Sequence, residues 1–295
     1  MEVGVKIDPG ASFPHHRGMS AARTITAAVI QMTSKADVAG NLDNAARLLA
    51  AASRRGAKLA VLPENFAFIG VHERDKLPFA ESLEPGSQPG PIITAMAEAA
   101  RRTGMILVLG GMPERGPDPD HVYNTCAVLA PDGRLVARYR KVHLFDIAIP
   151  GAAEFRESAS VSPGDGPVVV DTPWAPVGLS VCYDLRFPEL YRALVAGGAR
   201  ALVVPAAFTM HTGKDHWHVL LRARAIENQA YVLAAAQVGR ANDKRHCYGH
   251  ALIVDPWGIV VAEASDVEGV AVAELDLGLV ERTRREMPCL GHRKM

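Results

Sequence analysis

The first two-thirds of the chain alternates between apolar runs and segments with helical periodicity. Apolar runs at 24–32, 58–64 and 105–111 are typical of short buried strands. Between them, residues 38–56 and 91–104 repeat apolar positions at helical spacing, and each segment ends on a glycine, which is a common helix stop. This β-α-β-α-β order predicts an α/β fold built in layers.

Two hairpin patterns follow, one near the middle and one near the end of the chain. Residues 126–141 place Pro-Asp-Gly between two apolar runs, and residues 250–264 place Asp-Pro-Trp-Gly in the same position. Either these hairpins belong to an internal pseudo-repeat with two comparable sheets, or they are unrelated. The segments between them are predicted to be strands at 176–182, 200–208 and 231–237 and helices at 187–198 and 214–230.

The chain is predicted to form one domain. We see no linker-like composition inside residues 24–280, so the domain is expected to span 24–295, with a C-terminal arm from about residue 277. Residues 1–23 are rich in Gly, Pro and His and lack the apolar core of a signal peptide, which indicates a flexible tail. Met19 is therefore an alternative start.

Composition excludes several classes of protein. Thirty-two basic residues balance 32 acidic ones across 295 residues, so overall charge gives no reason to expect nucleic acid or an acidic membrane as partner. No apolar run is long enough to span a bilayer. The cysteines form no C-x-x-C pair, which argues against a zinc ribbon and favours the reducing cytoplasm. They are Cys126, Cys182, Cys247 and Cys289.

Three apolar runs end on side chains that a plain core does not require: Glu64, Lys141 and Cys182. Because active groups collect beyond the carboxyl ends of strands in α/β sheets, these three are expected to meet. A thiolate attacks carbonyl carbon, and Lys141 and a helix starting near Phe187 are expected to favour that thiolate. Glu64 would act as general base, while Lys141 and the N–H of Tyr183 would bind an oxyanion. This set indicates acyl transfer from nitrogen to water.

Each residue also has an ordinary structural interpretation. Cys182 could be a packing residue, Glu64 a helix cap and Lys141 a solvated strand end. A cysteine–histidine pair is a further catalytic alternative, in which imidazole replaces Glu64 as the base. The histidines considered for that role are His143, His216 and His218.

Three motifs that carry these residues resemble the nitrilase superfamily of carbon–nitrogen hydrolases. They are "LPENF" at 62–66, "YRKVHLFD" at 139–146 and "SVCYDLRFPELYR" at 180–192, in the order of that family's Glu, Lys and Cys signatures. The similarity extends from about residue 24 to 293. It implies a four-layer α-β-β-α sandwich, no metal or organic cofactor, and a homodimer or higher homo-oligomer.

The resemblance also assigns roles to individual residues. It implies that Cys182 is the nucleophile, Glu64 the general base and Lys141 the oxyanion stabiliser. The family has a second active-site glutamate after the lysine, and "IPGAAEFRES" at 149–158 offers Glu157 or Glu154. The "F-x-E-S" pattern favours Glu157.

Later segments narrow the resemblance to the Nit1-like branch, which includes the Nit domain of Nit–Fhit fusions. They are "PAAFTMHTGKDHWHVLLRARAIENQAYVLAAAQVGR" at 205–240, "YGHALIVDPWG" at 248–258 and "REMPCLGHRK" at 285–294. The implied activity is that of a cofactor-independent cysteine amidase, which converts a linear carboxamide to carboxylate and ammonia through a thioester, with deaminated glutathione as substrate. Alternatives are an ω-amidase acting on 2-oxoglutaramate or 2-oxosuccinamate, another superfamily hydrolase such as a nitrilase or N-carbamoyl amino acid hydrolase, and a non-catalytic interaction protein.

Substrate contacts are predicted from position. Phe208 and Thr209 follow a strand end near Cys182 and are expected to border the pocket, whereas Arg186 is expected to brace the nucleophile turn. Asn124 is expected to support Glu64 or Lys141 by hydrogen bonding. A salt-bridged helix or dimer surface is the favoured interpretation of Arg222, Arg224 and Glu227.

Overall fold

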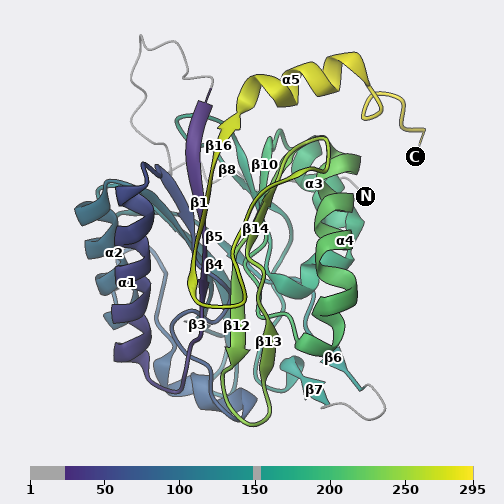
Figure 1. Cartoon of the computed structure of the whole chain (residues 1–295). Coiled ribbons are helices and arrows are strands. Elements are labelled where there is room, and N and C mark those ends of the chain that lie inside the picture. The colour runs from purple at the N-terminus through teal and green to yellow at the C-terminus, as the bar shows by residue number, and fades with distance from the viewer. Residues whose placement is uncertain (1–23, 149–153, 295) are drawn as a thin grey trace.

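The computed structural model describes residues 24–148 and 154–294. The predicted tail and the choice between Met1 and Met19 lie outside the described residues. Within this part of the chain, two sheets pack face to face and helices cover both outer faces (Figure 1). Helices α1 (Val38–Arg54) and α2 (Pro91–Thr103) lie on one side, and α3 (Pro188–Ala196) and α4 (Met210–Asn228) on the other. The predicted four-layer α-β-β-α sandwich is confirmed.

The larger sheet has eight strands and the smaller has six. The larger contains β1 (Thr24–Met32), β2 (Leu59–Val61), β3 (Ile106–Arg115), β4 (Val122–Leu129), β5 (Leu135–Arg140), β12 (Ala236–Arg240), β13 (His246–Tyr248) and β16 (Gly269–Asp276). The smaller contains β8 (Val168–Val170), β9 (Val177–Leu179), β10 (Ala201–Val203), β11 (Tyr231–Ala234), β14 (Leu252–Val254) and β15 (Val260–Glu263). A separate pair joins β6 (Asp146–Ile147) to β7 (Phe155–Arg156), and α5 (Leu277–Glu286) follows β16.

Alternation along the buried strands divides the apolar residues between two cores. In β1, Ile25, Ala27 and Val29 enter the core between the sheets, whereas Ala28 and Ile30 pack under α1 and α2. Successive side chains of a strand point to opposite faces, and both faces of this strand are covered. Between Ala27 and Ile30, the sequence of β1 therefore shows a continuous apolar run and not an alternation of apolar and polar residues.

The region predicted as one strand at 231–237 is divided between the two sheets. β11 belongs to the smaller sheet and β12 to the larger, with the chain crossing between them at Ala235. The prediction of a single strand was wrong because continuous apolar character reports burial and not sheet membership. The two predicted hairpins also lie in different sheets, β4–β5 in the larger and β14–β15 in the smaller.

Strand direction brings the site to one end of the sandwich. β1, β2 and β3 are mutually parallel in the larger sheet, and β9, β10 and β11 are parallel in the smaller. Their carboxyl ends therefore gather, and the segments that follow β2, β9 and β10 line a common pocket. Among the described helices, none combines the length and the apolar character required to cross a bilayer.

Candidate active site

Side chains from three separate elements form a buried ionic cluster. The Nζ atom of Lys141, which follows β5, donates to Glu64 Oε1 at 3.0 Å and to Glu157 Oε2 at 2.8 Å. Glu64 follows β2, and Glu157 begins the 3-10 turn Glu157–Ala159. All three are buried, so each carboxylate depends on the ammonium for compensation of its charge. The structure thus joins three of the four predicted site residues directly.

The fourth, Cys182, faces the same pocket. The space enclosed by the pocket walls, including its opening to solvent, is about 520 Å³. Tyr183, Phe208 and Thr209 lie on its wall as predicted. The complete set of lining residues is Glu64, Asn65, Glu73, Lys76, Lys141, Phe145, Phe155, Glu157, Cys182, Tyr183, Arg186, Ala207, Phe208, Thr209, Thr212 and Arg245.

Glu64 is held between both sheets. Its Oε2 accepts the backbone N–H of Ala207, beyond β10 of the smaller sheet, at 3.0 Å. Asn124 of β4 donates its Nδ2 to Glu64 Oε1 and to Glu157 Oε1, both at 3.0 Å. The predicted supporting role of Asn124 is therefore seen, and this amide orients both carboxylates around Lys141.

Two glutamates after Lys141, Glu154 and Glu157, were candidates for the second active-site carboxylate, and the structure places them in different environments. Glu157 Oε2 accepts the backbone N–H of Phe145 at 2.7 Å as well as the lysine. Glu154 is exposed and pairs with Arg156 at 3.0 Å. Only Glu157 of these two lines the pocket, so the preference for it agrees with the geometry.

Cys182 occupies a strained backbone position. It begins the 3-10 turn Cys182–Arg186 with a φ of 49°, a left-handed value that is uncommon outside glycine. Its N–H donates to Pro205 O at 2.9 Å, which ties the turn to the end of β10. The sequence predicted a helix N-terminus near Phe187 beside the thiol. In agreement, α3 begins at Pro188 with Phe187 as its N-cap, and the 3-10 turn Cys182–Arg186 lies between Cys182 and this helix.

The carboxylate of Asp184 holds this turn in place through hydrogen bonds. Its buried carboxylate accepts the N–H of Val181 at 2.8 Å and the hydroxyl of Tyr139 at 2.8 Å. The same carboxylate lies 2.7 Å from Nδ1 of His143, whose ring stacks on Phe187 with centroids 3.7 Å apart. The only sign of this anchor in the sequence is an acidic residue two positions after the cysteine.

The alternative of a histidine base is not supported by the geometry. His143 contacts Asp184, Nδ1 of His216 lies 3.2 Å from Arg186, and Nε2 of His218 lies 2.9 Å from Glu263. None of these three histidines lines the pocket that contains Cys182. Glu64 is therefore the base candidate that shares a pocket with the thiol.

Charges in the cluster determine the resting state of the thiol. Burial raises the pKa of Cys182 well above its usual range, and the carboxylate of Glu64 raises it further, while Lys141 opposes them. Lys141 favours the thiolate, as predicted, but burial and the carboxylate of Glu64 outweigh its effect on the pKa of Cys182. The thiol is protonated at rest, so catalysis requires a base to remove its proton.

Lys141 and Glu157 stabilise each other's charged forms. Burial opposes a charge on Lys141, but Glu157 and Glu64 outweigh this and hold its pKa well above the usual range. Burial similarly opposes ionisation of Glu157, but the lysine outweighs it and lowers the pKa of Glu157 to about 2.

The structure changes the role expected of Arg186 and adds a second role to Arg224. Arg186 was predicted to brace the nucleophile turn, but its guanidinium lies over the ring of Phe208 at 5.1 Å and faces the pocket. Arg224 braces the turn instead, because its Nη2 and Nε donate to Leu185 O at 2.8 and 3.0 Å. Arg224 also forms an ion pair with Glu227 at 2.9 Å, which agrees with the predicted salt-bridged helix.

Gly111 is a supporting residue that the sequence did not single out. It has a φ of +54°, and an added Cβ would lie 2.6 Å from Asn124 Oδ1 and 2.8 Å from Glu64 Cγ. Gly111→Ala is expected to cost more than the roughly 1–2 kcal/mol of a left-handed alanine and to lower kcat by displacing Glu64. Urea unfolding and kinetics measure both effects. Gly56→Ala is the matched control, since Gly56 has a φ of +86° and an added Cβ there meets nothing within 4 Å. Equal losses in the two variants would contradict this account.

The depressed pKa of Glu157 makes stability depend on pH in a defined direction. The folded value is about 2 against an ordinary 4.5, so its stabilising contribution is present above 4.5 and is lost as pH falls towards 2. The difference in free energy of unfolding between wild type and Glu157→Gln is expected to shrink over that interval. Urea unfolding of both chains at several pH values measures this. A difference that is constant with pH would show that the charge of Glu157 does not contribute.

Comparison with known proteins agrees with this geometry. Residues 26–285 match the carbon–nitrogen hydrolase family. A deaminated glutathione amidase from Synechocystis sp. is 45% identical over 270 residues, which cover 90% of this chain and 97% of that protein.

Two solved structures are also similar. The Caenorhabditis elegans NitFhit protein superposes with a TM-score of 0.85 at 41% identity, covering 92% of this chain and 65% of the longer fusion chain. Saccharomyces cerevisiae Nit3, a member of branch 10 of the nitrilase superfamily, superposes with a TM-score of 0.84 at 34% identity. The match covers 93% of this chain and 98% of the Nit3 chain. With the family match spanning most of its length, the chain belongs to the carbon–nitrogen hydrolase family of the nitrilase superfamily.

Proposed function

We propose that this protein is a cofactor-independent cysteine amidase in which Cys182 attacks the carbonyl carbon of a linear amide. The observation that carries the proposal is the buried Glu64–Lys141–Glu157 cluster, which lines the same pocket as Cys182. A purely structural role requires neither two buried carboxylates around one ammonium nor a strained cysteine, because such groups are costly to bury.

The first half-reaction begins with the protonated thiol. Glu64 takes the proton of Cys182 as sulfur bonds to the carbonyl carbon, so the pair of charges forms only when the substrate is in place. The carbonyl oxygen becomes an oxyanion, which the ammonium of Lys141 and the backbone N–H of Tyr183 stabilise. Glu64 then passes the proton to the amide nitrogen, the C–N bond breaks, and a thioester with Cys182 remains.

The second half-reaction returns the enzyme to its starting state. Water enters where the amine left, and Glu64 removes one of its protons as the oxygen attacks the thioester carbon. The tetrahedral intermediate collapses by breaking the C–S bond, and Glu64 returns the proton to the leaving sulfur. Glu157 keeps Lys141 charged and oriented through both steps, which agrees with its 2.8 Å contact to Nζ.

Deaminated glutathione is the substrate that we propose. Support comes from the name of the Synechocystis relative and from the charge of the pocket. Four cationic side chains face three carboxylates on the pocket wall, which favours an anionic substrate. Arg186 is positioned to contribute, because its guanidinium contacts aromatic rings and a histidine nitrogen and forms no ion pair with a described residue.

The leaving group distinguishes the proposed substrate from simpler amides. A primary carboxamide such as 2-oxoglutaramate releases ammonia, whereas the amide nitrogen of deaminated glutathione carries cysteinylglycine and leaves as that dipeptide. The expectation that ammonia is released therefore holds for primary amides and not for deaminated glutathione. Both substrates yield 2-oxoglutarate. One assay for that product therefore compares them directly, and ammonia release identifies primary amides and nitriles.

The test is a panel of deaminated glutathione, 2-oxoglutaramate, a nitrile and an N-carbamoyl amino acid. We expect kcat/KM for deaminated glutathione to exceed that for 2-oxoglutaramate by about tenfold or more, because the larger substrate makes additional polar contacts. A preference for 2-oxoglutaramate would identify an ω-amidase instead. Absence of turnover with every member would contradict the proposal of an amidase.

The predicted homodimer and cytoplasmic location remain proposals. Exposed apolar side chains on α4 and the β14–β15 turn support an association through this face, because exposed apolar patches commonly mark interfaces. They are Val219, Ile226, Trp257 and Ile259. Light scattering on the purified chain tests the dimer. The four cysteines are free, which fits a reducing compartment.

A further inference from the structure

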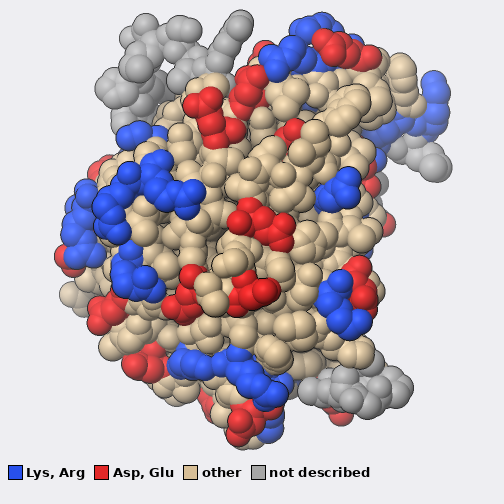
Figure 2. Space-filling model, in the orientation of Figure 1, with Lys and Arg blue, Asp and Glu red and all other residues tan. Residues whose placement is uncertain are grey.

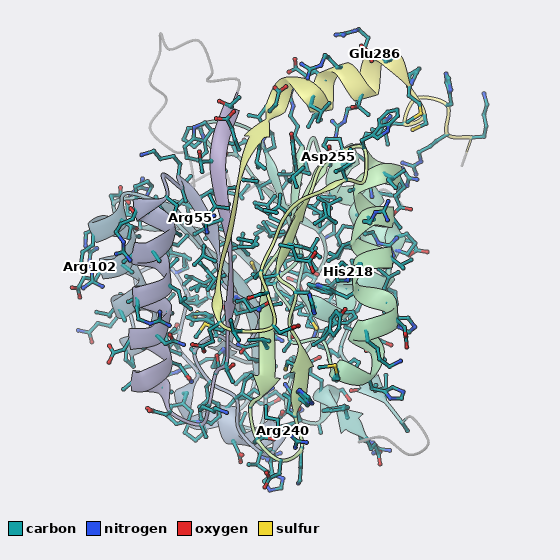
Figure 3. All side chains as sticks on the ribbon, viewed as in Figure 1. Arg55, Arg102, His218, Arg240, Asp255 and Glu286 are labelled. Atoms are coloured by element: carbon teal, nitrogen blue, oxygen red, sulfur yellow. The ribbon has the colours of Figure 1, made fainter. Side chains whose placement is uncertain are left out.

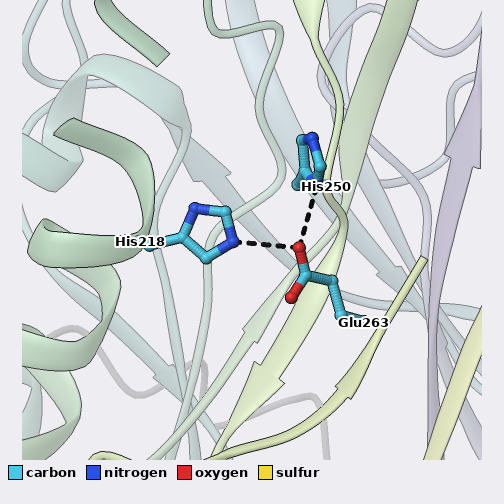
Figure 4. A group of neighbouring side chains, drawn as sticks. All are labelled: His218, His250 and Glu263. Carbon is cyan, nitrogen blue, oxygen red and sulfur yellow. Dashed lines mark hydrogen bonds and ion pairs between the residues drawn. The ribbon is translucent and has the colours of Figure 1, made fainter. Parts of the chain in front are cut away.

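A second cluster of chemically active side chains lies outside the pocket. His218 projects from α4 towards the smaller sheet, where it meets His250, between β13 and β14, and Glu263, the last residue of β15 (Figures 3 and 4). Nε2 of His218 and Nδ1 of His250 lie 2.9 and 2.8 Å from the same oxygen, Oε1 of Glu263. The proposed amide hydrolysis uses none of these groups.

We propose that His218, His250 and Glu263 form a binding site for Zn²⁺ or a similar borderline divalent cation. The three ligand atoms all lie within 4.8 Å of one another. Bonds of about 2.0 Å to tetrahedral Zn²⁺ separate neighbouring ligand atoms by about 3.3 Å, so a small outward shift of the side chains accommodates the ion. Two imidazoles and one carboxylate match the ligand preference of zinc and leave one position for water.

The second nitrogen of His250 is arranged as a metal-binding histidine requires. Its Nε2 lies 3.2 Å from Oδ1 of Asp266, so a proton on Nε2 has a carboxylate acceptor and Nδ1 is left free to bind a cation. Without a cation, an unprotonated Nδ1 would face the carboxylate oxygen of Glu263 at 2.8 Å, with both atoms acting as acceptors. Either a second proton on His250 or a bound cation resolves this conflict, and zinc titration distinguishes the two.

The electrostatic environment also favours a cation. Two carboxylates, Glu263 and Asp266, flank His250, whereas both imidazoles are uncharged in their metal-binding form. Acidic side chains also gather near the centre of this face (Figure 2).

The ligands come from elements whose relative positions are already fixed. Trp217, the neighbour of His218, donates its Nε1 to the backbone oxygen of His250 at 2.8 Å. Gly213 allows α4 to approach β13 closely, because an added Cβ would lie 2.4 Å from the side chain of Tyr248. The cation would therefore join α4 to β15 with little reorganisation, and preorganised ligands bind metals more tightly.

A link to the amidase pocket runs through α4. The ring of Trp217 packs against Phe208 with centroids 4.9 Å apart, and Phe208 lines the pocket. A cation would restrain His218, and the neighbouring residue Trp217 supports the pocket wall through Phe208. The proposal of the cation site does not depend on the proposed amidase activity.

The test is calorimetric titration of ZnCl₂ into the full chain after treatment with EDTA. Wild type is expected to bind Zn²⁺, and H218Q and E263Q are each expected to bind it at least about tenfold more weakly, because each loses one ligand. H121Q is the matched control and should leave the affinity unchanged. His121 also contacts a carboxylate, Asp118, at 2.8 Å, but it has no second histidine beside it. Far-UV circular dichroism checks that each variant is folded.

Thiols are competing ligands, so the titration is repeated in the C182S/C289S chain, where Zn²⁺ binding is expected to persist. Nuclear magnetic resonance of ¹⁵N-histidine provides a reading specific to the site. Among the 11 histidines, Zn²⁺ should shift the ring nitrogens of two, and the H218Q and E263Q variants should abolish that response. Equal affinity in wild type, H218Q and E263Q, loss of binding in C182S/C289S, or shifts at other histidines only would overturn the proposal.

Discussion

Replacing Cys182 with serine is expected to lower kcat by at least about 10⁴-fold while leaving substrate binding within a few-fold of wild type. The hydroxyl is nearly isosteric with the thiol but is a much weaker nucleophile, and Glu64 alone must activate it. Steady-state kinetics measure kcat, and calorimetric titration with the substrate of highest kcat/KM measures binding. The expected separation of the two effects identifies Cys182 as a group that acts in the chemical step.

Cys289→Ser is the control for this experiment, since Cys289 is exposed and distant in sequence from every pocket residue. It should retain wild-type kinetics. Mass spectrometry after rapid quenching should find an acyl adduct on wild type and none on Cys182→Ser. A serine variant with kcat within tenfold of wild type would exclude the proposed thioester.

The second large effect is expected on stability. Lys141→Met should reduce the free energy of unfolding by about 3–5 kcal/mol, because it leaves Glu64 and Glu157 buried without their cation. It should also abolish amide hydrolysis, since no ammonium remains to bind the oxyanion. Urea unfolding at neutral pH measures the first effect and steady-state kinetics the second.

A double variant separates these two consequences. Lys141→Met combined with Glu157→Gln removes one uncompensated charge and should regain part of the lost stability without regaining activity. Lys214→Met is the control for a lysine ion pair at the surface and should cost less than about 1 kcal/mol, because Lys214 and Asp215 are both exposed. If Lys141→Met were no more destabilising than Lys214→Met, the cluster would not be the balanced ionic unit described here.

Much of this site could be predicted because its residues interrupt strong local patterns. Glu64, Lys141 and Cys182 each end an apolar run, and strand direction then places them at one end of the fold. Glu157 carries no such signal, because it begins a short 3-10 turn, and it was found only through the family resemblance. Gly111 escaped prediction because its importance depends on contacts with Asn124 and Glu64, which are distant in sequence.

The protonation state of the thiol shows the limit of local reasoning. A lysine near a cysteine lowers the pKa of the thiol when the lysine is free to do so. In the folded protein, Lys141 is shared between Glu64 and Glu157, and burial from both sheets adds a penalty that no single segment reveals. The direction of the effect of Lys141 follows from the sequence, but the net direction of the pKa shift at Cys182 depends on burial and on Glu64, and therefore on the three-dimensional arrangement.

The passage of the chain between the sheets at Ala235 has a consequence for motion. Ala206 donates its N–H to Ala235 O at 2.9 Å, and Gln237 donates to Ala206 O at 2.9 Å, so the crossing is bonded to the segment that carries Ala207. Glu64 follows β2 of the larger sheet and Cys182 follows β9 of the smaller, and this crossing ties the two sheets together near both residues. Amide protons at these positions should exchange with solvent only when the whole domain unfolds. Local fluctuations are therefore not expected to separate Glu64 from Cys182.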